Sequence, residues 1–208
     1  MIKTGLKDLD LLIEGYKEEL NLIYGPPGSG KTTLCKIACI NLLKENKKII
    51  YLDTENGFSI ERFNQIVGNE SDKLLDNLII IKVKSLNDQF EKIENIKSLK
   101  KVNLVVIDSI GKFYREKVKE NPTEINEKFA IHLKSLREIT KNNIPVIITN
   151  QVYEDINNNK TVPLGGKLIQ NFCKKIIELK LQPRRIILKK PEEREMQFEI
   201  VKEGIKRV

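Results

Sequence analysis

The sequence predicts an α/β fold, in which a mainly parallel twisted sheet is flanked by helices and carries a C-terminal antiparallel extension. Two observations lead to this prediction. Short, almost continuously apolar segments alternate with helical segments, as expected for βαβ units whose strands are covered on both faces. Near the C-terminus, three strand-like segments follow one another with only tight connections, which favours antiparallel pairing.

The expected elements follow in order along the chain. Helical spacing of apolar residues separates the strands, and a basic loop precedes the last long helix. Strands are expected at residues 20–24, 48–52, 78–83, 102–107 and 144–149, with helices at 33–44, 59–67, 86–99 and 123–141. The later strands are expected at 175–181, 184–189 and 196–201. Pro183 and Pro191 fall between these three, where proline is tolerated.

Composition indicates one globular domain spanning residues 1–208. The chain is 40% hydrophobic and 32% charged, with a net charge of +8. It has no apolar run long enough for a membrane span and no visible secretory signal, so a cytoplasmic location is expected. A single histidine excludes a His-rich zinc site. The three cysteines are expected to be small buried residues, with a redox pair formed by Cys35 and Cys39 as the alternative.

Residues 25–32 read Gly-Pro-Pro-Gly-Ser-Gly-Lys-Thr and match the G-x-x-x-x-G-K-[ST] phosphate-binding loop of nucleoside triphosphatases. A predicted strand precedes this P-loop and a predicted helix follows it, as the mechanism requires; the alternative is a chance Gly/Pro-rich surface turn. Glycines allow backbone N–H groups to face phosphates, Lys31 reaches the β- and γ-phosphates, and Thr32 offers a hydroxyl to Mg²⁺. The predicted nucleotide-binding residues are Gly25, Pro26, Pro27, Gly28, Ser29, Gly30, Lys31, Thr32 and Thr33.

Three other predicted strands end in polar residues. Asp108 ends an apolar strand, where P-loop enzymes place the acid of the Mg²⁺ shell; the alternative is a helix N-cap. Glu55 follows a second strand and is able to polarise an attacking water, or else is a surface acid. Gln151 follows a third strand with Asn150, and an amide there contacts the γ-phosphate or forms an ordinary turn. The carboxyl ends of parallel strands meet at one edge, so these side chains are expected together.

Five ordered motifs resemble those of the RecA-type recombinase ATPases, most closely the archaeal RadA branch and its short RadB paralogues. The motifs are residues 25–32, 51–55 with Glu61-Arg62, 104–109, 148–152 and 163–166. The resemblance implies a RecA-like P-loop NTPase core with ATP and Mg²⁺ as ligands. It also implies that Glu55 is the catalytic base, Gln151 the γ-phosphate sensor and Asp108 the Mg²⁺-shell acid, with Lys31 assisting catalysis and Arg62 contacting the nucleotide.

The chain also departs from the RadA pattern. The core starts at residue 4, without the helical DNA-binding domain and polymerisation segment of RadA proteins. The segment 152–164 is short and has only Lys160 as a base, and Asn171 stands where strand-exchange relatives place a histidine. These departures lead us to expect monomers or small oligomers rather than filaments, no strand exchange by the chain alone, and a RadA-type recombinase as partner.

Positive charge is concentrated near the C-terminus. Residues 172–208 contain eleven Lys or Arg against six Glu, a net charge of +5. Such clusters bind phosphate backbones without base specificity, and the alternative is solvated surface. A second basic segment corresponds to the first DNA-binding loop of the relatives; its Phe113 and Tyr114 either stack on bases or belong to the core. The predicted contacts to single-stranded or junction DNA are Arg115, Lys117, Lys119, Arg184, Arg185, Lys189 and Lys190.

Together these features predict a DNA-binding ATPase that hydrolyses ATP slowly and assists homologous recombination and DNA repair. One alternative is a nucleotide-gated DNA- or protein-binding module with incidental hydrolysis. A second is a P-loop kinase of a small molecule, which is disfavoured because no Arg-rich lid segment is found.

Overall fold

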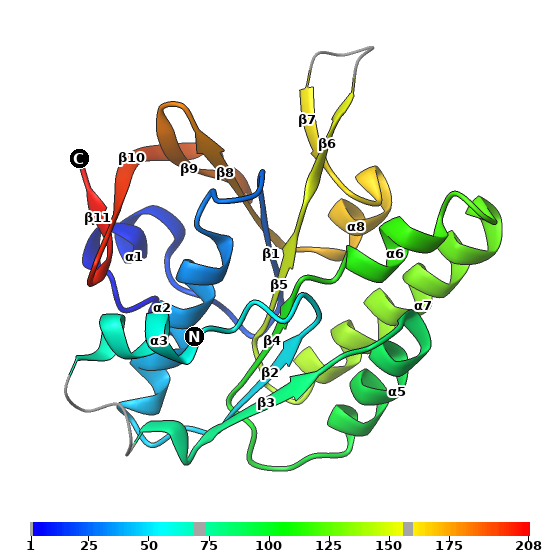
Figure 1. Cartoon of the computed structure of the whole chain (residues 1–208), viewed down its shortest axis with the longest axis horizontal. Coiled ribbons are helices and arrows are strands. Elements are labelled where there is room, and N and C mark those ends of the chain that lie inside the picture. The colour runs from blue at the N-terminus through cyan, green and yellow to red at the C-terminus, as the bar shows by residue number, and fades with distance from the viewer. Residues whose placement is uncertain (1, 69–73, 156–159) are drawn as a thin grey trace.

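One large sheet organises the computed structural model, which describes residues 2–68, 74–155 and 160–208 (Figure 1). Within these residues the sheet has nine strands in the order β11-β10-β9-β8-β1-β5-β4-β2-β3. The first five strands along the chain are β1 (Leu20–Tyr24), β2 (Ile49–Asp53), β3 (Leu78–Lys82), β4 (Leu104–Asp108) and β5 (Val146–Asn150). The later strands are β8 (Lys175–Leu181), β9 (Arg184–Lys190), β10 (Arg194–Val201) and β11 (Gly204–Arg207). A separate hairpin of β6 (Val152–Asp155) and β7 (Lys160–Pro163) projects from the sheet (Figure 1).

Pairing directions confirm the mainly parallel sheet with antiparallel C-terminal strands. Strands β8, β1, β5, β4, β2 and β3 are mutually parallel. Strands β9, β10 and β11 continue the sheet in antiparallel pairs. The first strand of the predicted extension, β8, joins β1 in parallel, because residues 165–174 carry the chain back to the sheet's opposite end before β8 begins. The fourth strand, β11, was not expected from the sequence.

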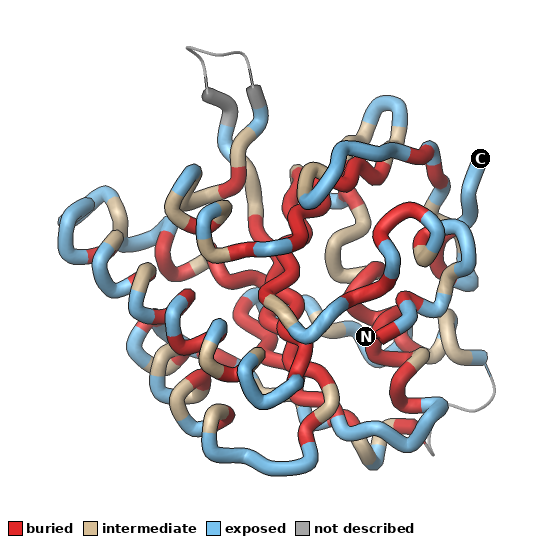
Figure 2. The backbone as a smooth tube through the Cα atoms, turned by 180° about the vertical axis from the view of Figure 1, so that it is seen from behind, coloured by how far each residue is buried: buried red, intermediate tan, exposed pale blue. Residues whose placement is uncertain are grey.

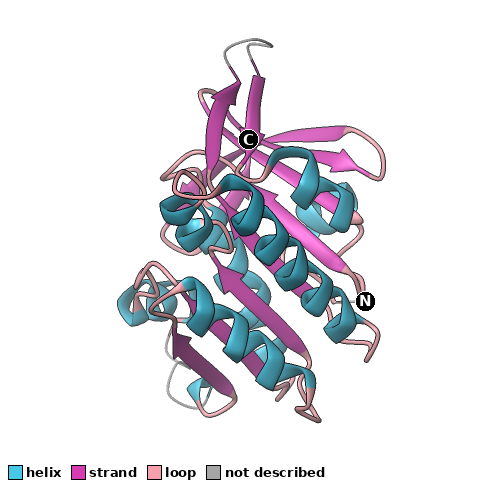
Figure 3. Ribbon diagram, turned by 90° about the vertical axis from the view of Figure 1, so that its right-hand side faces the viewer, coloured by secondary structure: helices cyan, strands magenta, loops and turns pink. Residues whose placement is uncertain are grey.

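Helices cover both faces of the sheet (Figures 1 and 3). One face carries α1 (Lys7–Ile13), α2 (Lys31–Leu43) and α3 (Ile60–Val67). The other carries α5 (Leu86–Lys97), α6 (Lys112–Lys117), α7 (Pro122–Thr140) and α8 (Gly166–Phe172). Strand side chains alternate between these two apolar layers, so that Tyr51 packs in the first layer and its neighbours Ile50 and Leu52 pack in the second.

The central strands are buried on both faces, as Figure 2 shows in red. Every residue of β1, β2, β4 and β5 is buried, which explains why these strands are almost purely apolar in sequence. In the part of the chain that the structure describes, no helix has the length and apolar character needed to cross a membrane.

The segment after β4 differs from the sequence prediction. The predicted basic loop after β4 contains the helix α6, whose Phe113 and Tyr114 are buried against α7. Short helices such as α1, α6 and α8 carry too few turns for their spacing to stand out in the sequence, and tertiary packing stabilises them. Residues 157–160 read Asn-Asn-Asn-Lys, a composition that predicts a loop, and the first three of them lie outside the described residues.

Candidate active site

The P-loop connects the end of β1 to the first turn of α2, at the carboxyl edge of the sheet. Gly28 and Gly30 have φ angles of 72° and 106°, in the left-handed region that favours glycine. A Cβ atom on Gly25 would lie 2.6 Å from the backbone oxygen of Leu179 on β8, so a larger residue does not fit there. Glycine is therefore required at these positions by backbone conformation and by the close approach of β8.

Lys31 lies across the P-loop. Its Nζ donates to the carbonyl oxygens of Gly25 at 2.8 Å and Pro26 at 2.9 Å. Burial lowers the pKa of the Lys31 ammonium, and the nearby carboxylates of Asp108 and Glu55 oppose that shift. The ammonium is thus held over the loop by contacts that a phosphate group can replace.

Asp108 is the centre of a buried hydrogen-bond cluster at the end of β4. Its Oδ2 accepts from the hydroxyls of Thr32 and Tyr51, each at 2.6 Å, and its Oδ1 accepts from the hydroxyl of Thr149. Burial and the adjacent Asp108 carboxylate raise the pKa of Tyr51, so this phenol remains a donor. Asp108 is not an N-cap, because α6 begins four residues later after Gly111. Tyr51 and Thr149 were not identified as site residues from the sequence, where each is one more residue of a buried strand.

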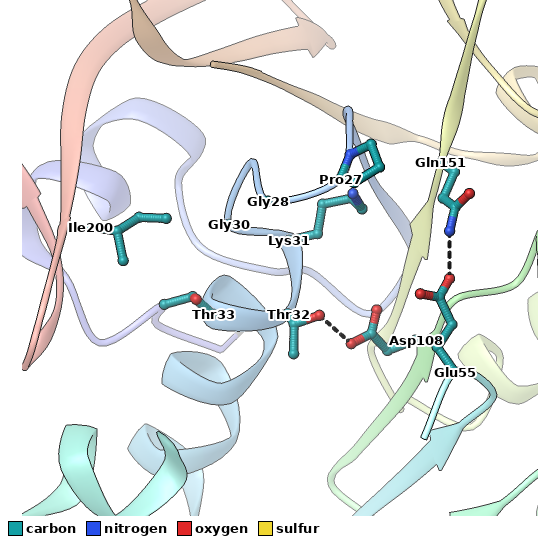
Figure 4. A pocket seen from close by; sticks show the side chains of 10 residues that line it. All are labelled: Pro27, Gly28, Gly30, Lys31, Thr32, Thr33, Glu55, Asp108, Gln151 and Ile200. Carbon is teal, nitrogen blue, oxygen red and sulfur yellow. Dashed lines mark hydrogen bonds between the residues drawn. The ribbon is translucent and has the colours of Figure 1, made fainter. Parts of the chain in front are cut away.

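Glu55 lies in the loop after β2 and faces the P-loop (Figure 4). Its Oε1 accepts from the Ser109 hydroxyl at 2.7 Å and from Nε2 of Gln151 at 2.9 Å. Asp53, at the end of β2, anchors this loop, because its buried carboxylate accepts the backbone N–H groups of Glu55, Gly57 and Phe58. Although Glu55 is exposed, its carboxylate points into the predicted site, which favours the interpretation as a site residue over that of a surface acid.

Strand register explains why these side chains meet. Asp53 pairs with Asp108 across β2 and β4, and Tyr24 pairs with Asn150 across β1 and β5. Parallel strands therefore deliver their carboxyl-terminal residues to one line along the sheet edge. Asn150 itself is buried, and its Nδ2 donates to the carbonyl oxygen of Leu164 at 2.8 Å, so it does not form a turn.

These residues surround a cavity of about 270 Å³ (Figure 4). The predicted residues that line it are Pro27, Gly28, Gly30, Lys31, Thr32, Thr33, Glu55, Asp108 and Gln151. Gly25 and Pro26 contribute carbonyls to Lys31 beside the cavity, and Ser29 is buried beneath the loop. Ile200 of β10 forms the opposite wall and was not identified from the sequence, where it is one apolar residue of an alternating strand.

Arg62 stands next to this wall. Its guanidinium donates to the carbonyl oxygens of Val201 at 2.7 Å and Lys202 at 2.9 Å, so it braces α3 against the end of β10. The structure therefore places Arg62 beside Ile200 rather than directly on the cavity lining.

The hydroxyl oxygen of Thr32 and the carboxylate oxygens of Asp108 are suitable ligands for Mg²⁺. A hydroxyl and a carboxylate oxygen lie 2.6 Å apart at the P-loop, and both are hard ligands. Mg²⁺ is usually held by one or two protein oxygens together with substrate phosphates and water, so it does not need a complete protein cage. Among the described residues, no group of three or more His, Cys, Asp or Glu side chains is placed to hold a metal ion.

The basic residues of α6 divide between two roles. Arg115 donates through Nη1 to Oε1 of Gln151, and Lys112 donates to the backbone oxygen of Thr54 at 2.6 Å. Lys117 instead pairs with Glu120 at 2.9 Å, and Lys119 is exposed just beyond the helix. Tyr114 stacks on Phe129 of α7, with ring centroids 4.4 Å apart. Phe113 and Tyr114 therefore belong to the core, as the alternative interpretation had it.

The C-terminal basic residues do not form one cluster. Arg184 and Lys190 lie at opposite ends of β9, roughly 20 Å apart at 3.3 Å per residue. Arg184 reaches the P-loop and donates to the Gly28 oxygen at 3.0 Å, whereas Lys190 donates to the Gln170 oxygen at 3.0 Å. The pairing partners of the remaining two are Glu195 for Arg185 and Glu193 for Lys189. The four residues are close in sequence, but an extended strand separates them in space.

The cysteines are all free and buried. Burial raises the pKa of both Cys35 and Cys39 well above the usual thiol value, so these thiols stay protonated. The interpretation as small core residues is therefore confirmed over that of a redox pair.

Comparison with known proteins places this geometry in a family. The profile of the Rad51 family matches residues 1–208. The DNA repair and recombination protein RadB of Methanococcus maripaludis is 35% identical over 210 residues, which cover 95% of this chain and 96% of that protein. The protein of the same name from Methanoculleus marisnigri is 35% identical over 221 residues, which cover 100% of this chain and 98% of that protein. A crystal structure of a RadB recombinase superimposes with a TM-score of 0.81, at 32% identity and complete coverage of both chains. The chain belongs to the Rad51 family of RecA-type recombinase ATPases.

Proposed function

We propose that this chain is a DNA-binding RecA-type ATPase, a single domain over residues 1–208, that assists homologous recombination and DNA repair. One observation carries the proposal: the P-loop, the Thr32–Asp108 pair and the Glu55–Gln151 pair converge on the same cavity. Membership of the Rad51 family supports ATP as the nucleotide. The names of the archaeal relatives support a role in recombination and repair.

Each residue of the cavity has a defined part in this proposal. Lys31 exchanges its contacts with the Gly25 and Pro26 carbonyls for the β- and γ-phosphates. Thr32 and Asp108 would hold Mg²⁺, which would supply positive charge beside the phosphate oxygens. Glu55 accepts the proton of the attacking water, and Gln151 orients that water beside the γ-phosphate.

Hydrolysis is expected to be slow. Lys31 is the one basic side chain among the described residues that line the cavity. Few positive groups are therefore placed to stabilise the charge that develops on the transferred phosphate, which favours a weak ATPase.

DNA is the proposed macromolecular ligand, single-stranded or at a junction. Arg115, Lys117 and Lys119 offer one basic surface at α6, and the two ends of β9 offer separate ones. Three of these side chains, those of Lys117, Arg185 and Lys189, are held by surface ion pairs, which are weak and are readily exchanged for phosphates. A RadA-type recombinase is the proposed protein partner, and we infer a monomer or small oligomer in the cytoplasm. Ile200 of the chain's own β10 lines the nucleotide cavity, which supports a site that functions without a neighbouring subunit.

The test is ATP turnover with and without single-stranded DNA, in the unmodified chain and in Lys31→Ala. The proposal predicts slow phosphate release that DNA stimulates, and its loss in Lys31→Ala, because the charge at the β- and γ-phosphates disappears. Nucleotide-dependent DNA binding without any turnover would instead establish a binding module. A phosphorylated small molecule would establish a kinase. Nucleotide affinity and turnover both unchanged in Lys31→Ala would rule out the P-loop assignment.

A further inference from the structure

Arg115 contacts Gln151 from outside the cavity lining. Its guanidinium donates to Oε1 of Gln151, while Nε2 of the same Gln151 donates to Glu55 at 2.9 Å. We propose that Arg115 is a positioning residue for ATP hydrolysis, which locks the side-chain amide of Gln151 in the orientation that serves Glu55. This inference rests on the proposed ATPase function and adds to it a residue that was expected only to contact DNA.

The chemistry of the two flanking groups sets the orientation of the amide. A guanidinium has donors and no acceptor, so only the oxygen of Gln151 can face Arg115. A carboxylate has acceptors and no donor, so only the nitrogen of Gln151 can face Glu55. Turning the amide over would place two donors together on one side and two acceptors together on the other. Arg115 and Glu55 therefore impose the same orientation, and both contacts are charge-assisted.

The orientation has a consequence for Glu55. Gln151 and Ser109 both donate to Oε1, and Ser109 follows directly after Asp108. Neither of these two donors occupies the second oxygen, Oε2, which is therefore left to accept a proton from water. A rotating Gln151 amide would release Oε1 and let the carboxylate turn. Arg115 thus acts on Glu55 through Gln151, without touching the nucleotide.

Helix α6 is built to hold Arg115 in this place. The Arg115 backbone N–H donates to the Gly111 oxygen at 2.9 Å, and Gly111 packs so closely on Asn150 that a Cβ would lie 2.1 Å from its Oδ1. Lys112, at the start of the helix, donates to the Thr54 oxygen beside Glu55. The helix is therefore attached both to the loop that carries Glu55 and to the end of β5 that carries Gln151.

The decisive experiment measures ATP turnover without DNA in Arg115→Met and Arg115→Lys. Met keeps the length and removes the donors, and Lys restores one donor. We expect kcat to fall about tenfold in Arg115→Met, to recover in part in Arg115→Lys, and the nucleotide Kd to stay within about twofold. Arg194→Met is the matched control, because Arg194 pairs with Glu192 on the surface and should leave turnover unchanged.

A double-mutant cycle isolates the route through Gln151. Adding Arg115→Met to Gln151→Ala should cause no further loss of kcat, since the amide that Arg115 orients is already absent. Additive losses would overturn the proposal. So would a normal DNA-free kcat in Arg115→Met with only weaker DNA affinity, because Arg115 would then be a DNA contact alone.

A readout without catalysis separates this inference from the proposed function. The side-chain amide signals of Gln151, assigned with Gln151→Ala, should shift and broaden in Arg115→Met in nuclear magnetic resonance spectra of the nucleotide-free chain. If the unmodified chain shows no turnover but this signal changes, the proposed ATPase fails while the Arg115 contact stands. An unchanged signal would refute the Arg115 contact even in an active ATPase.

Discussion

Asp53 anchors the loop that presents Glu55, and replacing it by asparagine gives a prediction that can be worked out bond by bond. Its Oδ1 accepts the N–H groups of Glu55 at 3.2 Å and Gly57 at 3.1 Å, and its Oδ2 accepts that of Phe58 at 3.0 Å. Asparagine keeps one oxygen for the first two donors. Its NH₂ group then faces the Phe58 N–H, so a partly buried donor meets a donor.

The magnitude follows from these three bonds. A buried donor left without an acceptor costs about 1–3 kcal/mol, and loss of the charge weakens the two remaining bonds by roughly 0.5–1 kcal/mol each. We therefore expect Asp53→Asn to lower the free energy of unfolding by about 3 kcal/mol, which for a chain of this size lowers Tm by roughly 6–12 °C. Because the Glu55 loop loses its anchor while the P-loop does not, kcat should fall more than nucleotide affinity.

The assays are urea or thermal unfolding together with nucleotide binding and turnover. Asp8→Asn is the matched control, because Asp8 is exposed in a long surface contact with Arg207 and should change stability by less than about 0.5 kcal/mol. If Asp53→Asn unfolds at the same temperature as the unmodified chain, the carboxylate does not hold this loop. If stability falls but kcat does not, the loop does not position Glu55.

Three further predictions concern catalysis, pH and DNA. Glu55→Gln should keep ATP binding but lower hydrolysis roughly a hundredfold or more, as measured by phosphate release, because a general base is removed. Unchanged turnover in this variant would show that Glu55 is not the general base. Burial holds the pKa of His132 at about 4, below the usual 6.5, so the unfolded chain gains its proton first as the pH falls. The free energy of unfolding should therefore fall by up to about 3 kcal/mol between pH 6.5 and 4, as followed by urea titrations, with a flatter profile in His132→Gln; identical profiles in the two proteins would contradict this. Neutralising Lys189 and Lys190 together should reduce the slope of log affinity for DNA against log salt concentration by roughly 0.7–0.9 for each phosphate that is no longer bound. An unchanged slope would indicate that DNA binds at α6 or at the other end of β9 instead.

Local sequence patterns were enough to predict the central βαβ units and most of the nucleotide cavity. The P-loop residues are contiguous, and their chemistry depends on the backbone of that segment. Asp108, Glu55 and Gln151 each follow an apolar strand, and parallel strands bring such residues to one edge wherever each strand lies in the sheet. These predictions needed only short-range patterns and one general rule of parallel sheets.

Tertiary structure determined the contacts between residues that are distant in sequence. Nothing near Ile200 in the sequence distinguishes it from other apolar strand residues, and it lines the cavity because β10 packs beside the P-loop at Gly30. Arg184 was assigned to DNA on charge alone, and Arg115 on charge together with the position of its segment in the family. Packing of α6 turned Arg115 toward Gln151, and the β8–β9 hairpin carried Arg184 to Gly28.

The physical reason is that charge and periodicity are properties of single segments, whereas a side chain's partner depends on which segments pack together. A run of basic residues is the same in sequence whether it is solvated, paired or turned toward an active site. The sequence by itself determined the fold class, the P-loop and the acids at the strand ends. Only the folded arrangement of α6, β9 and β10 decided which of the remaining residues reach that site, because those contacts are made across the sheet edge rather than along the chain.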